Sequence, residues 1–189
     1  MSMQWIILAL VIAVAVYAIA AYNRLVRQRN LVREGWSGID VQLKRRTDLI
    51  PNLVETVKAY AAHERGVFED VTEKRATSIS ADNVAGQANA ERALQGSLAR
   101  LFAVAEAYPA LKADQNFLSL QQELAEIEDQ LQMARRYYNG TVRNLNISIQ
   151  SFPSNLVAGP LGFRQEPFFE LDDRSEAAAP AVAFPGGKS

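Results

Sequence analysis

The hydrophobic and polar positions divide the chain into an apolar start, a long region of helical periodicity and an irregular end. Residues 1–23 carry no charged side chain, and the run from Trp5 to Tyr22 has neither glycine nor proline. Extended back to Met3, this run has 20 residues. As a helix it would span roughly 30 Å, the thickness of the hydrocarbon core of a bilayer. The pattern predicts that residues 1–23 form a single transmembrane anchor.

The alternative to a retained anchor is a cleaved signal peptide. The segment Ala18–Ala20 (AIA) resembles a cleavage site for such a peptide. A signal peptide has basic residues before its apolar core, whereas no Lys or Arg precedes this run, and the run is longer than a typical signal core. Trp5, Tyr17 and Tyr22 lie toward the ends of the run, where aromatic rings prefer the membrane interface. These features favour the anchor.

The basic residues that follow the apolar run set its expected orientation. Arg24, Arg27, Arg29 and Arg33 come directly after it. By the positive-inside rule the N-terminus lies outside and the rest of the chain lies in the cytoplasm. The same arginines could contact anionic lipid headgroups. Because the net charge is only −1, nothing in the composition favours nucleic acid as a partner.

Residues 24–152 show the apolar spacing of helices and no competing alternation of the kind that strands have. Apolar residues follow steps of three and four from Leu25 to Val71. A further helix is predicted from about Asn83 to Ala107, and Pro109 ends it. Asp114 is suited to cap the helix after that. This region is therefore predicted to be a cytoplasmic helical bundle.

The clearest pattern is a seven-residue repeat in the last predicted helix. Its members are Phe117, Leu124, Leu131, Tyr138, Leu145 and Phe152. Such a stripe favours helix-on-helix packing through a narrow, coiled-coil-like seam. The prediction is an all-α fold, in which a single N-terminal transmembrane helix precedes an antiparallel up-and-down four-helix bundle with long helices.

A proline interrupts the helical pattern in the segment Leu43–Val57 (LKRRTDLIPNLVETV) and allows two interpretations. In one, a single helix continues through Pro51 with a kink. In the other, which we favour, the chain reverses near Arg46. Arg45 and Arg46 then suit the end of one helix, and Asp48 caps the next. Pro51 would lie in the first turn, where its missing N–H has no helical partner.

The composition changes after residue 152. Residues 153–171 are irregular but apolar, with several prolines, glycines and phenylalanines, and residues 172–189 have the composition of a disordered tail. If the last helix returns toward the membrane, Phe163, Phe168 and Phe169 could dip into the interface. They could equally cap the end of the bundle.

Two further residues are interaction candidates. Trp36 lies between Gly35 and Gly38, whose small size would let another helix approach or would make room for the indole. Asp40 lies at the edge of an apolar stripe. A half-buried carboxylate there needs a cation such as Arg33, so a structural ion pair is a simpler interpretation than a functional acid.

Candidate chemistry is otherwise sparse. The chain has no cysteine, and its one histidine, His63, has no second histidine at helical spacing. The acidic residues Glu123, Glu126, Glu128 and Asp129 spread around a helix and indicate a solvated face. No glycine-rich phosphate loop or nucleophile elbow is present. We predict no catalytic residue, metal site or cofactor.

Several segments in combination resemble the LemA family of bacterial membrane proteins. They are YNRLVRQRNLVREGWSGIDVQLKRRTDLIPNLVETVKAYAAHE, AEAYPALKADQNFLSLQQELAEIEDQLQMARRYYNGTVRNLN, SIQSFPSNLVAG and GFRQEPFFE. The resemblance covers about residues 5–171 and implies one transmembrane helix followed by an up-and-down four-helix bundle. It carries no established enzymatic activity. A magnetosome-associated relative suggests, by analogy, a role in membrane organisation.

These observations together predict a non-enzymatic, membrane-anchored helical scaffold at the cytoplasmic face of a bacterial inner membrane. It would self-associate or recruit partners, and it could organise or remodel the membrane. The alternative is an adaptor or regulatory subunit of a membrane protease or transporter. The expected partners are the lipid bilayer, further copies of the chain and a membrane protein.

Overall fold

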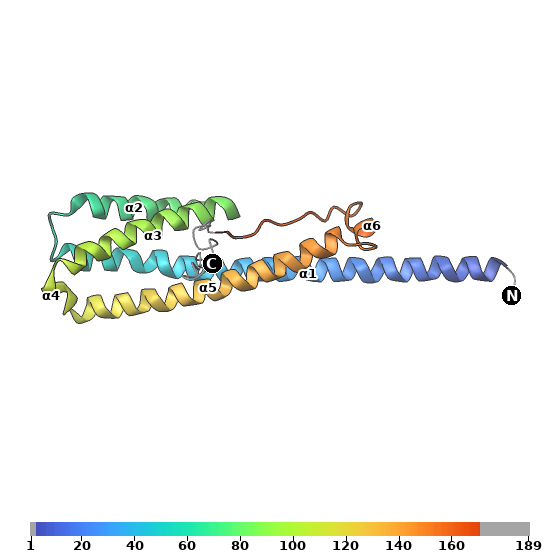
Figure 1. The fold of residues 1–189 in the computed structure, drawn as a ribbon, viewed down its shortest axis with the longest axis horizontal. Coiled ribbons are helices and arrows are strands. Elements are labelled where there is room, and N and C mark those ends of the chain that lie inside the picture. Colours follow the sequence, from blue (N-terminus) through green and yellow to red (C-terminus); the bar gives the residue numbers. More distant parts are fainter. Residues whose placement is uncertain (1–2, 171–189) are drawn as a thin grey trace, which may run out of the picture.

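The computed structural model describes residues 3–170, and within them the chain is helical with no strand. The helices are α1 (Met3–Lys58), α2 (Arg65–Ile79), α3 (Val84–Glu106), α4 (Pro109–Lys112), α5 (Gln115–Gln150) and α6 (Asn155–Ala158). The long helices lie side by side, and each runs opposite to the one before it (Figure 1). The predicted all-α class is confirmed. The predicted tail, residues 172–189, lies outside the described residues.

Helix α1 is much longer than the others, and its N-terminal part projects alone from the bundle (Figure 1). Its 56 residues correspond to about 84 Å. The most apolar 18-residue window has a mean hydropathy of 2.5, and only 6% of that window is buried inside the protein. The apolar side chains of this part face outward, so α1 is a candidate membrane anchor.

The predicted reversal near Arg46 is wrong, because α1 continues through Pro51 to Lys58. A proline inside a helix leaves the carbonyl four residues earlier without its N–H donor. Here that carbonyl belongs to Thr47, and Arg75 Nε on α2 donates a hydrogen bond to it at 2.6 Å. A side chain from another helix thus replaces the missing bond and lets α1 continue.

The other residues of the predicted junction lie inside α1 as well. Asp48 is exposed and accepts a hydrogen bond from Lys44 Nζ at 2.9 Å, so it caps no helix. Arg45 is also exposed, whereas Arg46 is 2% exposed. The chain reverses only at residues 59–64, after α1 has ended. The residues expected to form one helix after Asp48 therefore belong to two helices, the end of α1 and α2.

Two helix starts agree with the sequence-based predictions. Asn83 Oδ1 accepts a hydrogen bond from the Gly86 amide at 2.8 Å and caps α3. Asp114 accepts from the amides of Asn116 at 2.9 Å and Phe117 at 3.0 Å and caps α5. The Phe117 amide and the Tyr60 hydroxyl both lower the pKa of Asp114, because they stabilise its carboxylate. The predicted cap at Asp114 is confirmed, as is the predicted helix start near Asn83.

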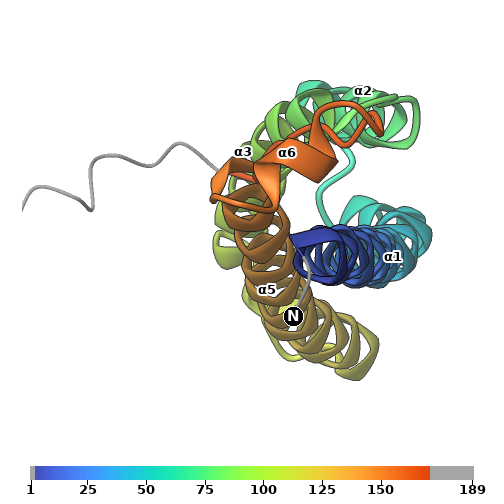
Figure 2. The ribbon, with the colours of Figure 1, turned by 90° about the vertical axis from the view of Figure 1, so that its right-hand side faces the viewer.

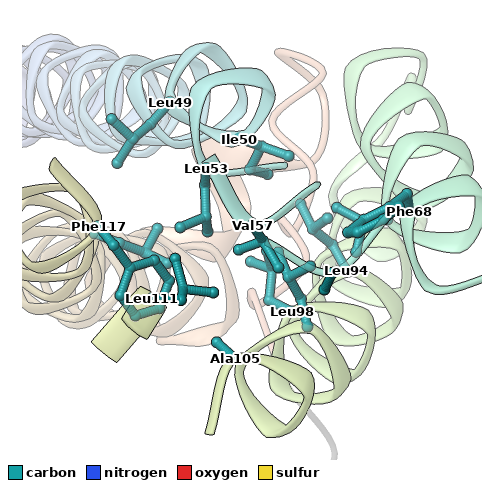
Figure 3. Packing of buried hydrophobic residues seen from close by; sticks show 14 of the residues in the cluster. Leu49, Ile50, Leu53, Val57, Phe68, Leu94, Leu98, Ala105, Leu111 and Phe117 are labelled. Atoms are coloured by element: carbon teal, nitrogen blue, oxygen red, sulfur yellow. The ribbon is translucent and has the colours of Figure 1, made fainter. Parts of the chain in front are cut away.

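The core lies where α1, α2, α3 and α5 come together, at the end away from the N-terminus. Figure 3 shows side chains from α1, α2, α3, α4 and α5 meeting there, among them Leu53, Val57, Phe68, Leu98 and Phe117. The α2–α3 pair covers one side of the α1–α5 pair, as the view along the long axis shows (Figure 2). The seven-residue stripe is buried at Phe117, Leu124, Leu131, Tyr138 and Leu145. Its last member, Phe152, lies beyond the end of α5 and is 79% exposed.

After α5, the chain turns through α6 and runs back along the bundle (Figure 1). We call residues 159–170 the C-terminal strap. The strap and α6 contribute Ala158, Phe163 and Phe169 to a second apolar cluster with α1 and α5. This cluster lies nearer to the candidate membrane anchor than the core described above.

Candidate interaction site at the anchor and the C-terminal strap

The aromatic residues predicted to flank the anchor all lie on α1. Trp5 is 66% exposed, and Tyr17 and Tyr22 are each about 40% exposed. The ring of Tyr22 also packs edge-on against Phe163, with 5.9 Å between ring centres. Tyr22 therefore contacts the strap from the end of the apolar run.

The arginines after the apolar run have different surroundings. Arg24 and Arg27 are exposed. Arg29 is partly buried, and its guanidinium lies 5.0 Å from the centre of the Phe163 ring. A cation over an aromatic face is attracted to it. Arg29 therefore helps to hold the strap, whereas Arg24 and Arg27 remain available to lipid headgroups.

Phe163 and Phe169 are buried inside the protein, which excludes one of the two alternatives for them, insertion into the membrane interface, and leaves packing against the bundle. Phe163 is 6% exposed and Phe169 is 3% exposed, whereas Phe168 is 38% exposed. The ring of Phe169 packs on Trp36, with 6.1 Å between ring centres, and Trp36 packs on Tyr138 at 5.5 Å. Trp36 thus packs between Tyr138 and the strap, and the two buried phenylalanines pack against α1 and α5.

Two asparagines on α5 hold the backbone of the strap. Asn139 Nδ2 donates to the Phe169 carbonyl at 3.1 Å, and its Oδ1 accepts from the Phe169 amide at 2.9 Å. Asn146 makes the same pair of bonds with Glu166, both at 2.9 Å. Seven residues of helix and three residues of extended chain both span about 10 Å, so the two spacings match. Each asparagine carboxamide therefore bonds to the strap backbone through both its donor and its acceptor, as the backbone of an adjacent strand would.

Tyr138, directly before Asn139 on α5, adds one more bond. Its hydroxyl donates to the Pro167 carbonyl at 2.9 Å. Burial, together with the nearby negative charge of Glu166, raises the pKa of Tyr138 to about 12. The phenol therefore keeps its proton, and the bond to the strap persists across physiological pH.

Replacing Asn139 with alanine is expected to loosen the strap locally. Asn139 makes two hydrogen bonds to Phe169. Each contributes about 1 kcal/mol net, so losing both would speed exchange of the strap amides about 30-fold. Hydrogen exchange at the Phe169 amide measures this effect. Asn144, exposed on the same helix, is the matched control. Equal exchange rates in the Asn139→Ala and Asn144→Ala variants would show that Asn139 does not hold the strap.

A network of buried charges lies between α1, α3 and α5. Arg46 Nη1 contacts Glu91 Oε2 at 2.7 Å, and Arg46 Nη2 contacts Glu128 Oε1 at 2.8 Å. Arg46 and Glu91 are 2% and 1% exposed, and Glu128 is 32% exposed. Ser78 from α2 and Gln87 from α3 donate to the other oxygen of Glu91. The charges are thus paired with one another and hydrogen-bonded.

Arg135 on α5 lies beside this network and beside the strap. It is 6% exposed, and its guanidinium lies 5.0 Å from the centre of the Phe169 ring. Burial lowers the pKa of Arg135, and the nearby charges of Glu91 and Glu128 partly oppose this effect. Arg135 therefore links the strap electrostatically to the buried network.

The sequence-based predictions missed the network. Arg46 was assigned to a helix end and Glu128 to a solvated face, and Glu91 was not considered. A signal was present for two of them, because each is a charged residue within an apolar stripe. Arg46 lies between Leu43 and Ile50, and Glu91 lies three residues from Leu94. Asp40, expected to be half-buried, is instead exposed and has no ion pair within the described residues.

The described residues contain no group of three or more His, Asp or Glu side chains placed to hold a metal ion. His63 lies exposed in the loop between α1 and α2. The most deeply buried charged side chains, Arg46 and Glu91, pair with each other.

Fold and site together define an all-helical protein with an N-terminal candidate membrane anchor and a polar interior that joins its helices. The sequence profile of the LemA family matches residues 35–184, and the chain belongs to this family. The chain is 26% identical over 186 residues to magnetosome protein MamQ 2 of Paramagnetospirillum magneticum, covering 85% of this chain and 68% of that protein. It is 25% identical over 155 residues to protein LemA of Metamycoplasma hominis, covering 80% and 69%. The predicted family is confirmed.

Proposed function

We propose that this protein is a non-enzymatic scaffold, anchored in a bacterial inner membrane by α1, which self-associates or recruits partners at the cytoplasmic face. The continuity of α1 carries the proposal, because one helix forms both the candidate anchor and a side of the bundle. The bundle is then held in a fixed direction relative to the membrane. Arg24 and Arg27, exposed just after the apolar run, support a cytoplasmic bundle.

The absence of catalysis in this proposal is supported by how the polar groups are used. The buried charges of Arg46 and Glu91 pair with each other, and Ser78 donates a hydrogen bond to Glu91. The relatives named for the magnetosome support a structural role in association with membrane. The proposal extends that role to organisation of the membrane by copies of the chain.

Self-association is supported by an apolar ridge on the outer side of the α1–α5 pair. We define the ridge as Met133 and Tyr137 of α5, which are 51% and 48% exposed. Tyr137 lies against Gly35 of α1, where an added Cβ would be 3.3 Å from its ring. Met133 precedes Tyr137 by about one turn, so the two side chains lie along one face. Exposed apolar groups of this kind suit contact with a second bundle.

Cross-linking through the ridge tests self-association. The chain has no cysteine, so a Tyr137→Cys variant carries a single thiol. We expect a short bifunctional maleimide to produce dimers of this variant in native membranes. Thr77→Cys, exposed on α2 and away from the ridge, is the matched control.

The Thr77→Cys variant also tests the proposed orientation. If the bundle lies in the cytoplasm, a membrane-impermeant thiol reagent should fail to label this cysteine in intact cells.

The products distinguish the proposed scaffold from the adaptor. Dimers of Tyr137→Cys without dimers of Thr77→Cys support contact between copies through the ridge. A single foreign protein as the dominant product would favour the adaptor of a membrane protease or transporter. If both variants remained monomeric at the density of native membranes, self-association through α1 and α5 would be refuted.

A further inference from the structure

We infer that the turn between α5 and the strap inserts into the phospholipid leaflet that faces the bundle, beside α1. We call residues 147–161, which comprise the last turn of α5, α6 and the start of the strap, the α5–α6 tip. The inference rests on the membrane anchoring proposed above and adds a second lipid contact to it. The protein would then be fixed to the membrane at two places, by a spanning helix and by a shallow apolar turn.

The position of the tip follows from its neighbours on α1. Phe152 and Ile147 line one side of a hollow of about 430 Å³, and Tyr17, Ala21 and Arg24 line the other. Tyr17 lies within the charge-free run, seven residues before Arg24, which is about 10 Å along the helix. If that run spans a bilayer, any group beside Tyr17 lies deeper in the membrane than Arg24. A depth of about 10 Å is typical of interfacial insertion.

The side chains of the tip suit lipid better than water. Ile147, Phe152, Leu156 and Leu161 are 55%, 79%, 65% and 53% exposed. All four lie within the tip, at the end of α5 that is nearer the anchor (Figure 1), and each is more than half exposed. Exposed apolar groups gathered in this way indicate a contact surface. The adjoining apolar run of α1 identifies that surface as the bilayer.

The charge pattern around the tip agrees with this depth. No charged residue occurs from Asn144 to Phe163, and an arginine stands at either side, Arg143 and Arg164. Both arginines are exposed, as is Arg24 on α1. Apolar side chains can therefore enter the acyl region while the arginines stay at the level of the phosphates.

The backbone of the tip is also suited to a low-dielectric environment, where an unpaired N–H or carbonyl is costly. Ser154 Oγ donates to the carbonyls of Ser148 and Ser151 at the end of α5, at 2.6 and 2.9 Å. The amides from Asn155 to Gly159 all donate to carbonyls within the turn, and two positions, 153 and 160, are prolines without an N–H. An irregular segment that satisfies most of its own amides can enter the interface.

Fluorescence in reconstituted vesicles tests the inference. A Phe152→Cys variant of the full chain would carry one environment-sensitive fluorophore, because the natural sequence has no cysteine. The vesicles contain equal parts of phosphatidylcholine and phosphatidylglycerol, with a small share of lipid bearing a nitroxide near the headgroup. We expect several-fold stronger quenching by the nitroxide at Phe152 than at Leu118. Leu118 is an exposed leucine at the opposite end of α5 and serves as the matched control.

A third label, at Ile12 in the apolar run, separates this inference from the anchoring that it needs. Quenching at Ile12 and Phe152 but not at Leu118 supports the tip contact. Quenching at Ile12 alone overturns the tip contact and leaves the anchor intact, and no quenching at Ile12 refutes the anchor itself. If iodide in solution and the nitroxide lipid both failed to quench Phe152, another protein copy would cover the tip, and the inference would be wrong.

Discussion

Replacing Glu91 with alanine is expected to lower the free energy of unfolding by about 3–5 kcal/mol, the usual loss when one partner of a buried ion pair is removed. Arg46 would keep only Glu128, and Ser78 and Gln87 would lose their shared acceptor. Urea unfolding of the full chain in mild detergent, followed by circular dichroism, measures the effect. Glu123→Ala, which removes an exposed glutamate from α5, should change stability by no more than about 0.5 kcal/mol.

A double substitution distinguishes the cost of leaving one buried charge unpaired from the cost of burying the charged pair itself. Changing Arg46 to Met and Glu91 to Leu together removes both buried charges and their desolvation cost. We expect this variant to be more stable than Glu91→Ala, because apolar replacements of buried ion pairs are often neutral or stabilising. Should Glu91→Ala be no less stable than Glu123→Ala, the network would contribute nothing to the fold.

The parts of the fold that could be predicted from sequence are those decided by nearby residues. The caps at Asn83 and Asp114 are examples, because each side chain bonds to amides two or three residues away. The seven-residue stripe was likewise readable, because a helix repeats its faces at fixed intervals. Phe152 departs from the stripe because α5 ends at Gln150.

The parts that could not be predicted depend on partners far away in sequence. Arg46 and Glu91 are 45 positions apart, and Asn139 and Phe169 are 30 positions apart. The phenylalanines of the strap show the same limit, because their apolar character predicts burial without saying whether lipid or protein buries them. Asn139 and Asn146 hold the strap backbone against α5, and Phe163 and Phe169 are buried within the protein. Phe152, by contrast, is exposed.

The error at Pro51 has the same origin and leads to the second large effect, at Arg75. The local sequence favoured a reversal, because every nearby charge suited a helix end. The structure keeps one helix because Arg75, 28 positions from Thr47, supplies the donor that Pro51 lacks. The direction of the bundle relative to the anchor therefore depends on a contact between α1 and α2. Local sequence rules cannot predict this contact, because its two residues are far apart in the chain.

Replacing Arg75 with alanine is expected to lower the free energy of unfolding by about 2 kcal/mol, because it leaves the carbonyl of a buried residue without its donor. Thr47 is 5% exposed, so water has little access to compensate. Arg75→Lys should recover part of the loss, since an ammonium can donate but lacks the planar geometry of the guanidinium. The same urea unfolding measurement gives both values.

Pro51→Ala tests the cause of this effect. An alanine at position 51 has an N–H that can bond to the Thr47 carbonyl within α1, so Arg75 is no longer the necessary donor. The loss on Arg75→Ala should therefore fall below about 1 kcal/mol when Pro51 is already alanine, and the difference between the two backgrounds is the coupling energy. An equal loss in both backgrounds would mean that Arg75 stabilises the protein by some other contact and does not replace the hydrogen bond that the proline removes.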